Sequence, residues 1–188
     1  MNTFYKSEER LLVNGCLKQD RLAQKQLYEK YVHAVFHTCL RICGQETHAE
    51  DITQEVFVRA FNRIDSFKGE SSLGAWIKQI AVHASLNHVK RYQNWLPLTE
   101  VPTLKEQVGE STIPPSEWSV HIIHNAIQKL PPGSRAVLSL YLIEGYQHKE
   151  IAQILGISES TSKSQYHRAK RLLQAQLKTN HPFLLDMI

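Results

Sequence analysis

Prolines divide this chain into two parts. Four of its seven prolines lie between Tyr92 and Trp118. Proline lacks a backbone N–H and forces the residue before it out of helical geometry, so no long helix can run through this segment. We therefore predict a linker over residues 93–117, which joins a larger N-terminal domain (residues 8–92) to a smaller C-terminal domain (residues 118–180).

Apolar residues recur at three- and four-residue steps on both sides of the linker. One stripe runs from Leu27 to Ile42 and stops before Gly44, a second covers 52–64, and a third begins at Leu73. Strand-type alternation is missing from the sequence. These periodicities predict an all-α fold, with an N-terminal helical bundle and a C-terminal helical domain.

Charge and composition restrict the partners and the location of the chain. The formal net charge of +4 is spread as +3 over residues 1–92, −3 over the linker and +4 over residues 118–188, so a polyanion could meet basic surface in both domains. No apolar run approaches the ~20 residues that a membrane-spanning helix needs. The start of the chain does not resemble a secretion signal, and three cysteines are too few for a disulfide framework. We predict a cytoplasmic protein without membrane insertion.

The segment 148–177 has the pattern of a helix-turn-helix. Gly156 permits the tight turn between two helices, and Ser158 can cap the second one. Short hydrogen-bonding side chains that could reach base edges stand near the start of that helix, and cations that could bind phosphates follow. They are Ser160, Thr161, Ser164, Lys163, Arg168, Lys170 and Arg171. The alternative is an ordinary helical hairpin whose basic face is only solvated.

An acidic face is predicted on the helix that carries the 52–64 stripe. Asp51, Gln54, Glu55 and Val58 are spaced three or four residues apart, on the side away from the stripe. Such a patch beside exposed apolar surface suits docking onto a basic partner helix. A merely solvated face is the alternative.

The loop over residues 65–72 and the helix after it form a further candidate site. Polar donors in the loop beside Trp76 could hold an unstacked base, because single strands are held by aromatic faces and hydrogen-bonding loops. The alternative places Trp76 in the core, since it lies on the stripe that begins at Leu73. Cations of the following helix could bind a DNA backbone.

The spacing of histidine, cysteine and acidic residues favours neither a metal site nor catalysis. His33 and His37 form one i,i+4 pair and Cys39 and Cys43 another, but the two pairs lie on different helix faces. Buried cysteine behaves as a small hydrophobe, which favours a core role. No catalytic triad, phosphate loop or paired-carboxylate arrangement is evident. We expect no metal, no cofactor and no enzymatic activity.

Two motif sets, in a fixed order, resemble a known family. The stretches EDITQEVFVRAF and FKGESSLGAWIKQIA precede the linker, and HKEIAQILGISESTSKSQYHRAKRLL follows it. Together they resemble a bacterial RNA polymerase sigma factor of the two-domain extracytoplasmic-function (ECF) group, over about residues 8–178. The resemblance implies a promoter-specificity subunit. Its partners would be core RNA polymerase, double-stranded promoter DNA and the melted non-template strand, with an anti-sigma factor as a regulatory partner.

The resemblance also assigns roles to residues. Those implied to bind core polymerase are Asp51, Gln54, Glu55 and Phe57. Those implied to hold the −10 element are Lys68, Gly69, Glu70, Ser71 and Ser72 in the loop, with Trp76, Lys78, His83, Asn87 and Arg91 on the next helix. Those implied to read the −35 element are Ser160, Thr161, Lys163, Ser164, His167 and Arg168, followed by the phosphate-binding candidates Lys170 and Arg171.

Three departures from the family pattern alter these expectations. Val82-His83 replaces an Arg-Asn pair, which changes the expected base preference in the −10 helix. Ser162 stands where an apolar residue is usual and Gln165 where an arginine is usual, so one core contact and one cation are expected to be lost. Two other functions remain open: a dimeric helix-turn-helix regulator that binds an operator without polymerase, and a protein–protein adaptor without a DNA role.

Overall fold

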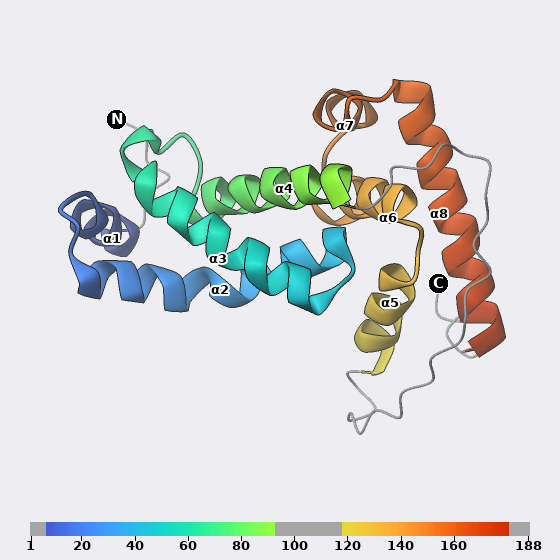
Figure 1. Cartoon of the computed structure of the whole chain (residues 1–188), viewed down its shortest axis with the longest axis horizontal. Coiled ribbons are helices and arrows are strands. Elements are labelled where there is room, and N and C mark those ends of the chain that lie inside the picture. The colour runs from blue at the N-terminus through green and yellow to red at the C-terminus, as the bar shows by residue number, and fades with distance from the viewer. Residues whose placement is uncertain (1–6, 93–117, 181–188) are drawn as a thin grey trace. The chain divides into compact units, whose positions relative to one another are not determined.

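The computed structural model describes residues 7–92 and 118–180, and every regular element in them is helical, without a strand (Figure 1). The predicted all-α class is confirmed. The chain divides into two compact units, residues 1–88 and 89–188. The predicted linker, 93–117, lies outside the described residues, and the domain limits given above stay a prediction.

The structure describes four α-helices and a short 3₁₀ turn within residues 7–92, and the last of these helices extends past the boundary of the first unit at His88. Their bounds are α1 (Ser7–Leu17), α2 (Arg21–Cys43), α3 (Glu46–Asn62), η1 (Ile64–Ser66) and α4 (Leu73–Tyr92). The carboxylate of Asp20 accepts a hydrogen bond from the Leu22 amide at 2.9 Å and so caps the start of α2. Gly44 ends α2 with φ of 76°, as its position in the sequence predicts.

The predicted apolar stripes form the core of this unit. Leu27 and Ile42 of α2, Val56 of α3, and Leu73 and Ile77 of α4 are all fully buried. Together with their neighbours they hold α2 against α3 and give both helices one solvent-facing side.

The contact between α1 and α2 depends on a close approach at Gly15. A Cβ atom placed on Gly15 would lie 2.4 Å from the Cβ of Ala23, so any larger residue would push the helices apart. The Tyr31 hydroxyl donates to the buried carboxylate of Glu9 at 2.9 Å and ties the same two helices together. Burial and this carboxylate raise the pKa of Tyr31.

The second unit contains four α-helices and a π-helical stretch. Their bounds are α5 (Trp118–Gln128), α6 (Pro132–Leu138), the π-helix η2 (Ser139–Ile143), α7 (His148–Leu155) and α8 (Glu159–Asn180). α6 begins at Pro132, because a proline fits the first position of a helix, where its missing N–H has no intrahelical partner. The core of the second unit contains a cluster formed by Ile127, Leu130, Leu138 and Ala169.

A buried arginine joins α5 to α6. Arg135 is only 5% exposed, and its guanidinium donates to the carbonyl oxygens of Gln128 at 3.0 Å and Leu130 at 2.9 Å. These carbonyls close the end of α5, where the helix dipole favours a cation. Arg135 is therefore a structural residue of this unit.

Candidate nucleic-acid interface

The acidic face of α3 is exposed as the spacing predicts. Asp51, Gln54 and Glu55 face solvent beside Val58, which is 57% exposed. Glu55 forms an ion pair with Arg59, one turn further along the same helix. A compact set of acids next to an uncovered apolar side chain can bind a basic, partly apolar surface.

Phe57, assigned to the same docking face, lies elsewhere. Its side chain is 3% exposed, and its ring meets that of Tyr28 edge-on with centroids 4.7 Å apart. In this structure Phe57 supports α3 from the inside, and Tyr28 covers it at the surface.

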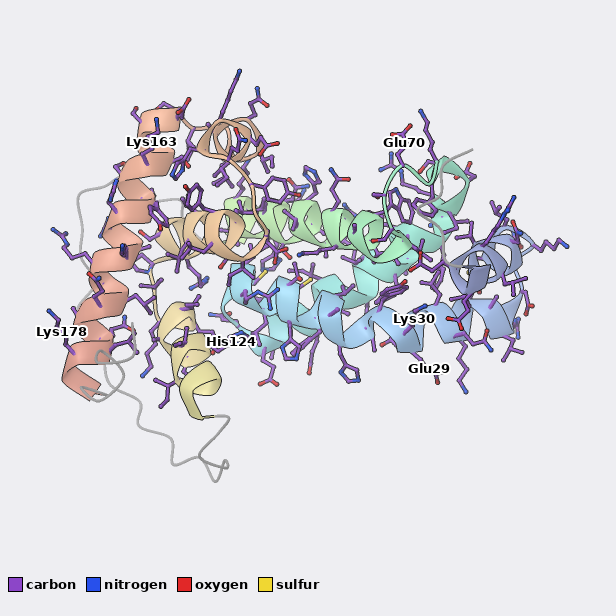
Figure 2. All side chains as sticks on the ribbon, turned by 180° about the vertical axis from the view of Figure 1, so that it is seen from behind. Glu29, Lys30, Glu70, His124, Lys163 and Lys178 are labelled. Atoms are coloured by element: carbon purple, nitrogen blue, oxygen red, sulfur yellow. The ribbon has the colours of Figure 1, made fainter. Side chains whose placement is uncertain are left out.

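The loop of residues 65–72, which we call the capture loop, presents its polar side chains to solvent. Lys68, Glu70, Ser71 and Ser72 are exposed, and Figure 2 shows Glu70 on the loop beyond the end of the helices. Gly69 is buried with φ of 70°, a backbone conformation that favours glycine. The loop therefore offers hydrogen-bond donors and acceptors on a backbone that bends sharply at Gly69.

Trp76 of α4 contacts Phe67 of the capture loop, and its burial is intermediate between the two predicted roles, a core residue and a base-binding residue. Its side chain is half-buried, and its ring is 5.3 Å from that of the buried Phe67. One part of the indole thus packs in the core, and the remaining part is open to solvent next to the loop.

The exposed face of α4 carries His83, Asn87 and Arg91 at four-residue steps, and Lys78 is half-buried. Val82, in contrast, is 1% exposed and packs inward. Of the two positions at which this helix departs from the family pattern, only His83 is therefore open to a ligand.

The helix-turn-helix is formed as the sequence predicts. Gly156 has φ of 68° and ends α7, and the Ser158 hydroxyl accepts from the Thr161 amide at 3.0 Å to cap α8. The polar face of α8 is largely open: Ser160, Lys163, Ser164, His167, Lys170 and Arg171 are exposed, and Thr161 and Arg168 are half-buried. Figure 2 shows Lys163 near the start of α8 and Lys178 near its end, so cations extend over most of the helix.

Glu159 modifies this basic face. Its carboxylate lies 2.6 Å from the Lys163 ammonium, one turn away on α8. The hydrogen bond and charge of Lys163 lower the pKa of Glu159. The first cation of the helix is therefore already paired.

The structure corrects two expectations, the loss of a core contact at Ser162 and the loss of a surface cation at Gln165. Both side chains point inward, with exposures of 0% and 8%. Ser162 is within 2.9 Å of His148 Nδ1, and Gln165 Oε1 accepts from the Ser134 hydroxyl at 2.6 Å. The expected lost core contact is replaced by a polar one. Gln165 leaves no gap among the surface cations, since its position faces α6.

Neither a metal site nor a membrane helix is found in residues 7–92 and 118–180. In these ranges no three His, Cys, Asp or Glu side chains converge to hold an ion. Cys16, Cys39 and Cys43 are buried free thiols, and burial raises the pKa of Cys16 and Cys39. No helix in the same ranges is both long enough and apolar enough to cross a bilayer.

Comparisons with known proteins identify the family. Residues 27–95 match Sigma-70 region 2, and residues 121–173 match Sigma-70 region 4. The chain is 30% identical over 172 residues to the ECF RNA polymerase sigma factor SigW of Bacillus subtilis, an alignment that covers 86% of this chain and 92% of SigW. The chain belongs to the ECF RNA polymerase sigma factors.

Other relatives of this sigma factor agree. The ECF RNA polymerase sigma-E factor of Escherichia coli K12 is 27% identical, over 88% of this chain and 92% of its own. Among solved structures, CnrH in complex with the cytosolic domain of CnrY matches with a TM-score of 0.51 at 22% identity, covering 92% of this chain and 98% of CnrH. RpoE of Bartonella quintana, in complex with the anti-sigma factor NepR, matches with 0.52 at 22%, covering 84% and 98%. These structures share the fold.

The residues that contact the inner face of α8 in this sigma factor were not predicted from the sequence. His148, Tyr141 and Ser134 come from α7, η2 and α6, and they contact side chains of α8. A signal for them was present: Ser162 and Gln165 are polar residues at positions where the helical period of α8 requires buried side chains. A buried polar residue predicts a polar partner, but not which one.

Proposed function

We propose that this RNA polymerase sigma factor, which acts in transcription initiation, divides promoter recognition between its two units. The acidic face of α3 (Asp51, Gln54, Glu55) binds core polymerase. The capture loop and the exposed face of α4 hold the melted −10 region, and α8 reads the −35 region in the major groove. Catalysis belongs to the polymerase, and the chain alone is inert and acts in the cytoplasm.

The observation that carries this proposal is the opposite charge of two exposed faces, one on α3 and one on α8. Acids gather on an exposed face of α3, and cations with hydroxyls gather on the exposed face of a capped helix after a helix-turn-helix turn. In this proposal, contacts with several phosphates supply affinity through counterion release, and hydroxyls near the start of α8 contact base edges. Extruding one base costs a few kcal/mol, which many such contacts and the polymerase can offset together.

An anti-sigma factor is the proposed regulator. The matching RpoE structure is a complex with an anti-sigma factor. We propose that a protein of this class restrains the present chain by covering one or both proposed interfaces, which prevents assembly with polymerase.

Run-off transcription with purified core polymerase tests the proposal. Adding the full chain should start transcription from promoters recovered with the chain from cells. Glu55→Lys should reduce it about tenfold or more, because like charges facing each other across an interface cost several kcal/mol. Glu29→Lys is the matched control, since Glu29 also pairs with a cation one turn away, Lys25, and is similarly exposed. Equal loss in both variants would contradict the assigned docking face.

The same reagents separate the two alternatives. An operator-binding regulator would bind its DNA without polymerase and would not need Asp51 or Glu55. A protein–protein adaptor would keep its function after charge reversal at Lys163 and Arg168. Transcription that depends on the chain and is lost after both kinds of reversal fits only the sigma-factor roles proposed here.

A further inference from the structure

The inner face of α8 is unusual at its DNA-proximal end. Further along the helix this face is apolar, with Ala169 and Leu177 buried in the core. In the turns that carry the proposed base-reading side chains, however, the buried residues are Ser162 and Gln165. The part of α8 that must be placed most accurately is therefore held by polar side chains.

Each of these side chains contacts a different helix. Ser162 Oγ and His148 Nδ1 are 2.9 Å apart, which ties α8 to the first residue of α7. Gln165 Oε1 accepts from the Ser134 hydroxyl of α6 at 2.6 Å. Two hydrogen bonds thus connect adjacent turns of α8 to two separate supports.

Aromatic rings hold His148 in place. Tyr141 of η2 stacks on the imidazole with ring centroids 4.4 Å apart and an interplanar angle of 10°. Tyr166 of α8 meets both rings, at 4.8 Å from Tyr141 and 5.7 Å from His148. His148 therefore has an orientation fixed by its neighbours, and its Nδ1 atom is aimed at Ser162.

Directional contacts constrain α8 more than apolar contacts do. An apolar side chain keeps most of its burial when a helix rotates or slides slightly, whereas a buried hydroxyl or imidazole nitrogen that loses its partner costs free energy. Recognition of base edges requires side chains to be placed within about 0.5 Å. A polar contact at Ser162 therefore disfavours nearby orientations of α8 that an apolar contact would tolerate.

We propose that His148 is a positioning residue for promoter recognition: through its hydrogen bond to Ser162 it sets the rotation and axial position of α8, and so determines how sharply the −35 element is distinguished from other DNA. This inference rests on the proposed assignment of α8 to the −35 element. It adds a determinant of specificity that does not itself contact DNA.

The test uses holoenzyme reconstituted from core polymerase and the full chain. Promoter duplexes are first selected from a random-sequence library with the wild-type holoenzyme, and the upstream block of the selected DNA is then scrambled. The measured quantity is the ratio of affinities for selected and scrambled duplexes, together with the salt dependence of binding. Failure of the wild-type holoenzyme to discriminate would overturn the assignment of α8 itself, whatever the variants do.

Three single variants separate positioning from stability. His148→Phe keeps a ring against Tyr141 but loses the nitrogen, and Ser162→Ala loses the hydroxyl. Each should lower the discrimination ratio about fivefold, the value of one hydrogen bond of ~1 kcal/mol. His148→Asn keeps a nitrogen in the position of Nδ1 and should retain most of the discrimination. The salt dependence should not change, because the cations of α8 are untouched.

The double variant His148→Phe/Ser162→Ala is decisive. Removing both partners leaves no unpaired polar group, so thermal stability should recover relative to Ser162→Ala. Discrimination should stay low, since the directional contact is gone. Ser85→Ala, which truncates an equally buried serine in α4, is the control and should leave the ratio unchanged. Recovery of discrimination together with stability, or wild-type discrimination in every single variant, would overturn the proposal.

Discussion

The capture loop and the start of α8 present similar side chains in different ways. The loop turns on Gly69, and its exposed residues Lys68, Glu70, Ser71 and Ser72 belong to no helix. On α8, comparable hydroxyls stand on a continuous helix that is capped by Ser158 and attached to α6 and α7 by buried hydrogen bonds. A loop of this kind can adjust to an extruded base, whereas duplex DNA has a fixed groove and suits a rigid reader.

The largest expected effect concerns the second unit, which contains α8. Arg135→Met should lower the free energy of unfolding by about 3 kcal/mol, because two carbonyls at the end of α5 lose a charged donor. Urea unfolding of the full chain measures the loss, and hydrogen exchange should place it in α5 and α6.

Thr53→Val is the control for this change in the first unit. The Thr53 hydroxyl donates to the Ala49 carbonyl oxygen, four residues earlier in the same helix, so its loss should cost about 0.5 kcal/mol. Equal losses in the two variants would show that bonds between helices contribute no more rigidity than local ones.

The next effect separates the two surfaces proposed to bind DNA. Glu70→Ala/Ser71→Ala should weaken binding of holoenzyme to a single-stranded −10 oligonucleotide about tenfold, within the range of ~1–3 kcal/mol for a held base. Lys163→Ala/Arg168→Ala should leave that binding unchanged and instead weaken binding to upstream duplex, lowering the slope of log affinity against log salt by about 2. Fluorescence anisotropy measures both. If either variant affected both ligands equally, the division of roles would be wrong.

A smaller effect compares the two helix caps. The Ser72 hydroxyl accepts from the Ala75 amide at 3.2 Å, at the start of α4. The Ser158 hydroxyl caps α8 and also lies 2.8 Å from the hydroxyls of Ser160 and Thr161. Ser158→Ala should therefore cost about 1.5 kcal/mol and Ser72→Ala about 0.5 kcal/mol. Thermal unfolding of the full chain measures both, and a reversed order would contradict the more rigid support of α8.

The smallest expected effect is a dependence of stability on pH in both units. Burial, with the nearby charge of Lys163, lowers the pKa of His148, and burial, with His48, lowers the pKa of His88. The unfolded chain, with a histidine pKa of about 6.5, therefore binds more protons than the folded chain as pH falls. Stabilisation is complete above about pH 6.5 and is lost as pH drops through the folded pKa values.

Urea titrations between pH 7.5 and 5 check this dependence. His148→Asn and His88→Asn should each flatten part of the slope. An unchanged slope in both variants would assign the dependence to other groups.

The apolar stripes and the helix-ending turns could be predicted from the sequence, but the packing partners of individual side chains could not. Leu27, Val56 and Ile77 are buried as their spacing predicts, because helical period and burial are directly linked. Phe57 was assigned to the surface by its motif, yet it packs under Tyr28. Its neighbour Val56 already marked the buried side, and a wide apolar stripe includes both.

The π-helical stretch η2 was not predictable from periodicity. Its backbone widens so that the Glu144 amide donates to the carbonyl of Ser139 at 3.0 Å. The extra residue in this turn places Tyr141 where it can stack on His148, while Leu142 remains 57% exposed. Such a register change depends on contacts with α7 and α8, which are distant in the sequence.

The ion pairs Glu55–Arg59 and Glu159–Lys163 engage one acid on the proposed polymerase-binding face and one cation on the proposed DNA-binding face before any partner binds. A phosphate that binds Lys163 must replace Glu159 as its ion-pair partner, and a basic helix that binds Glu55 must replace Arg59. Binding at these positions is therefore an exchange of one ion pair for another. A polyanion that exchanges only one ion pair gains little binding free energy. A ligand that offers several replacements at once, in matching geometry, gains from all of them.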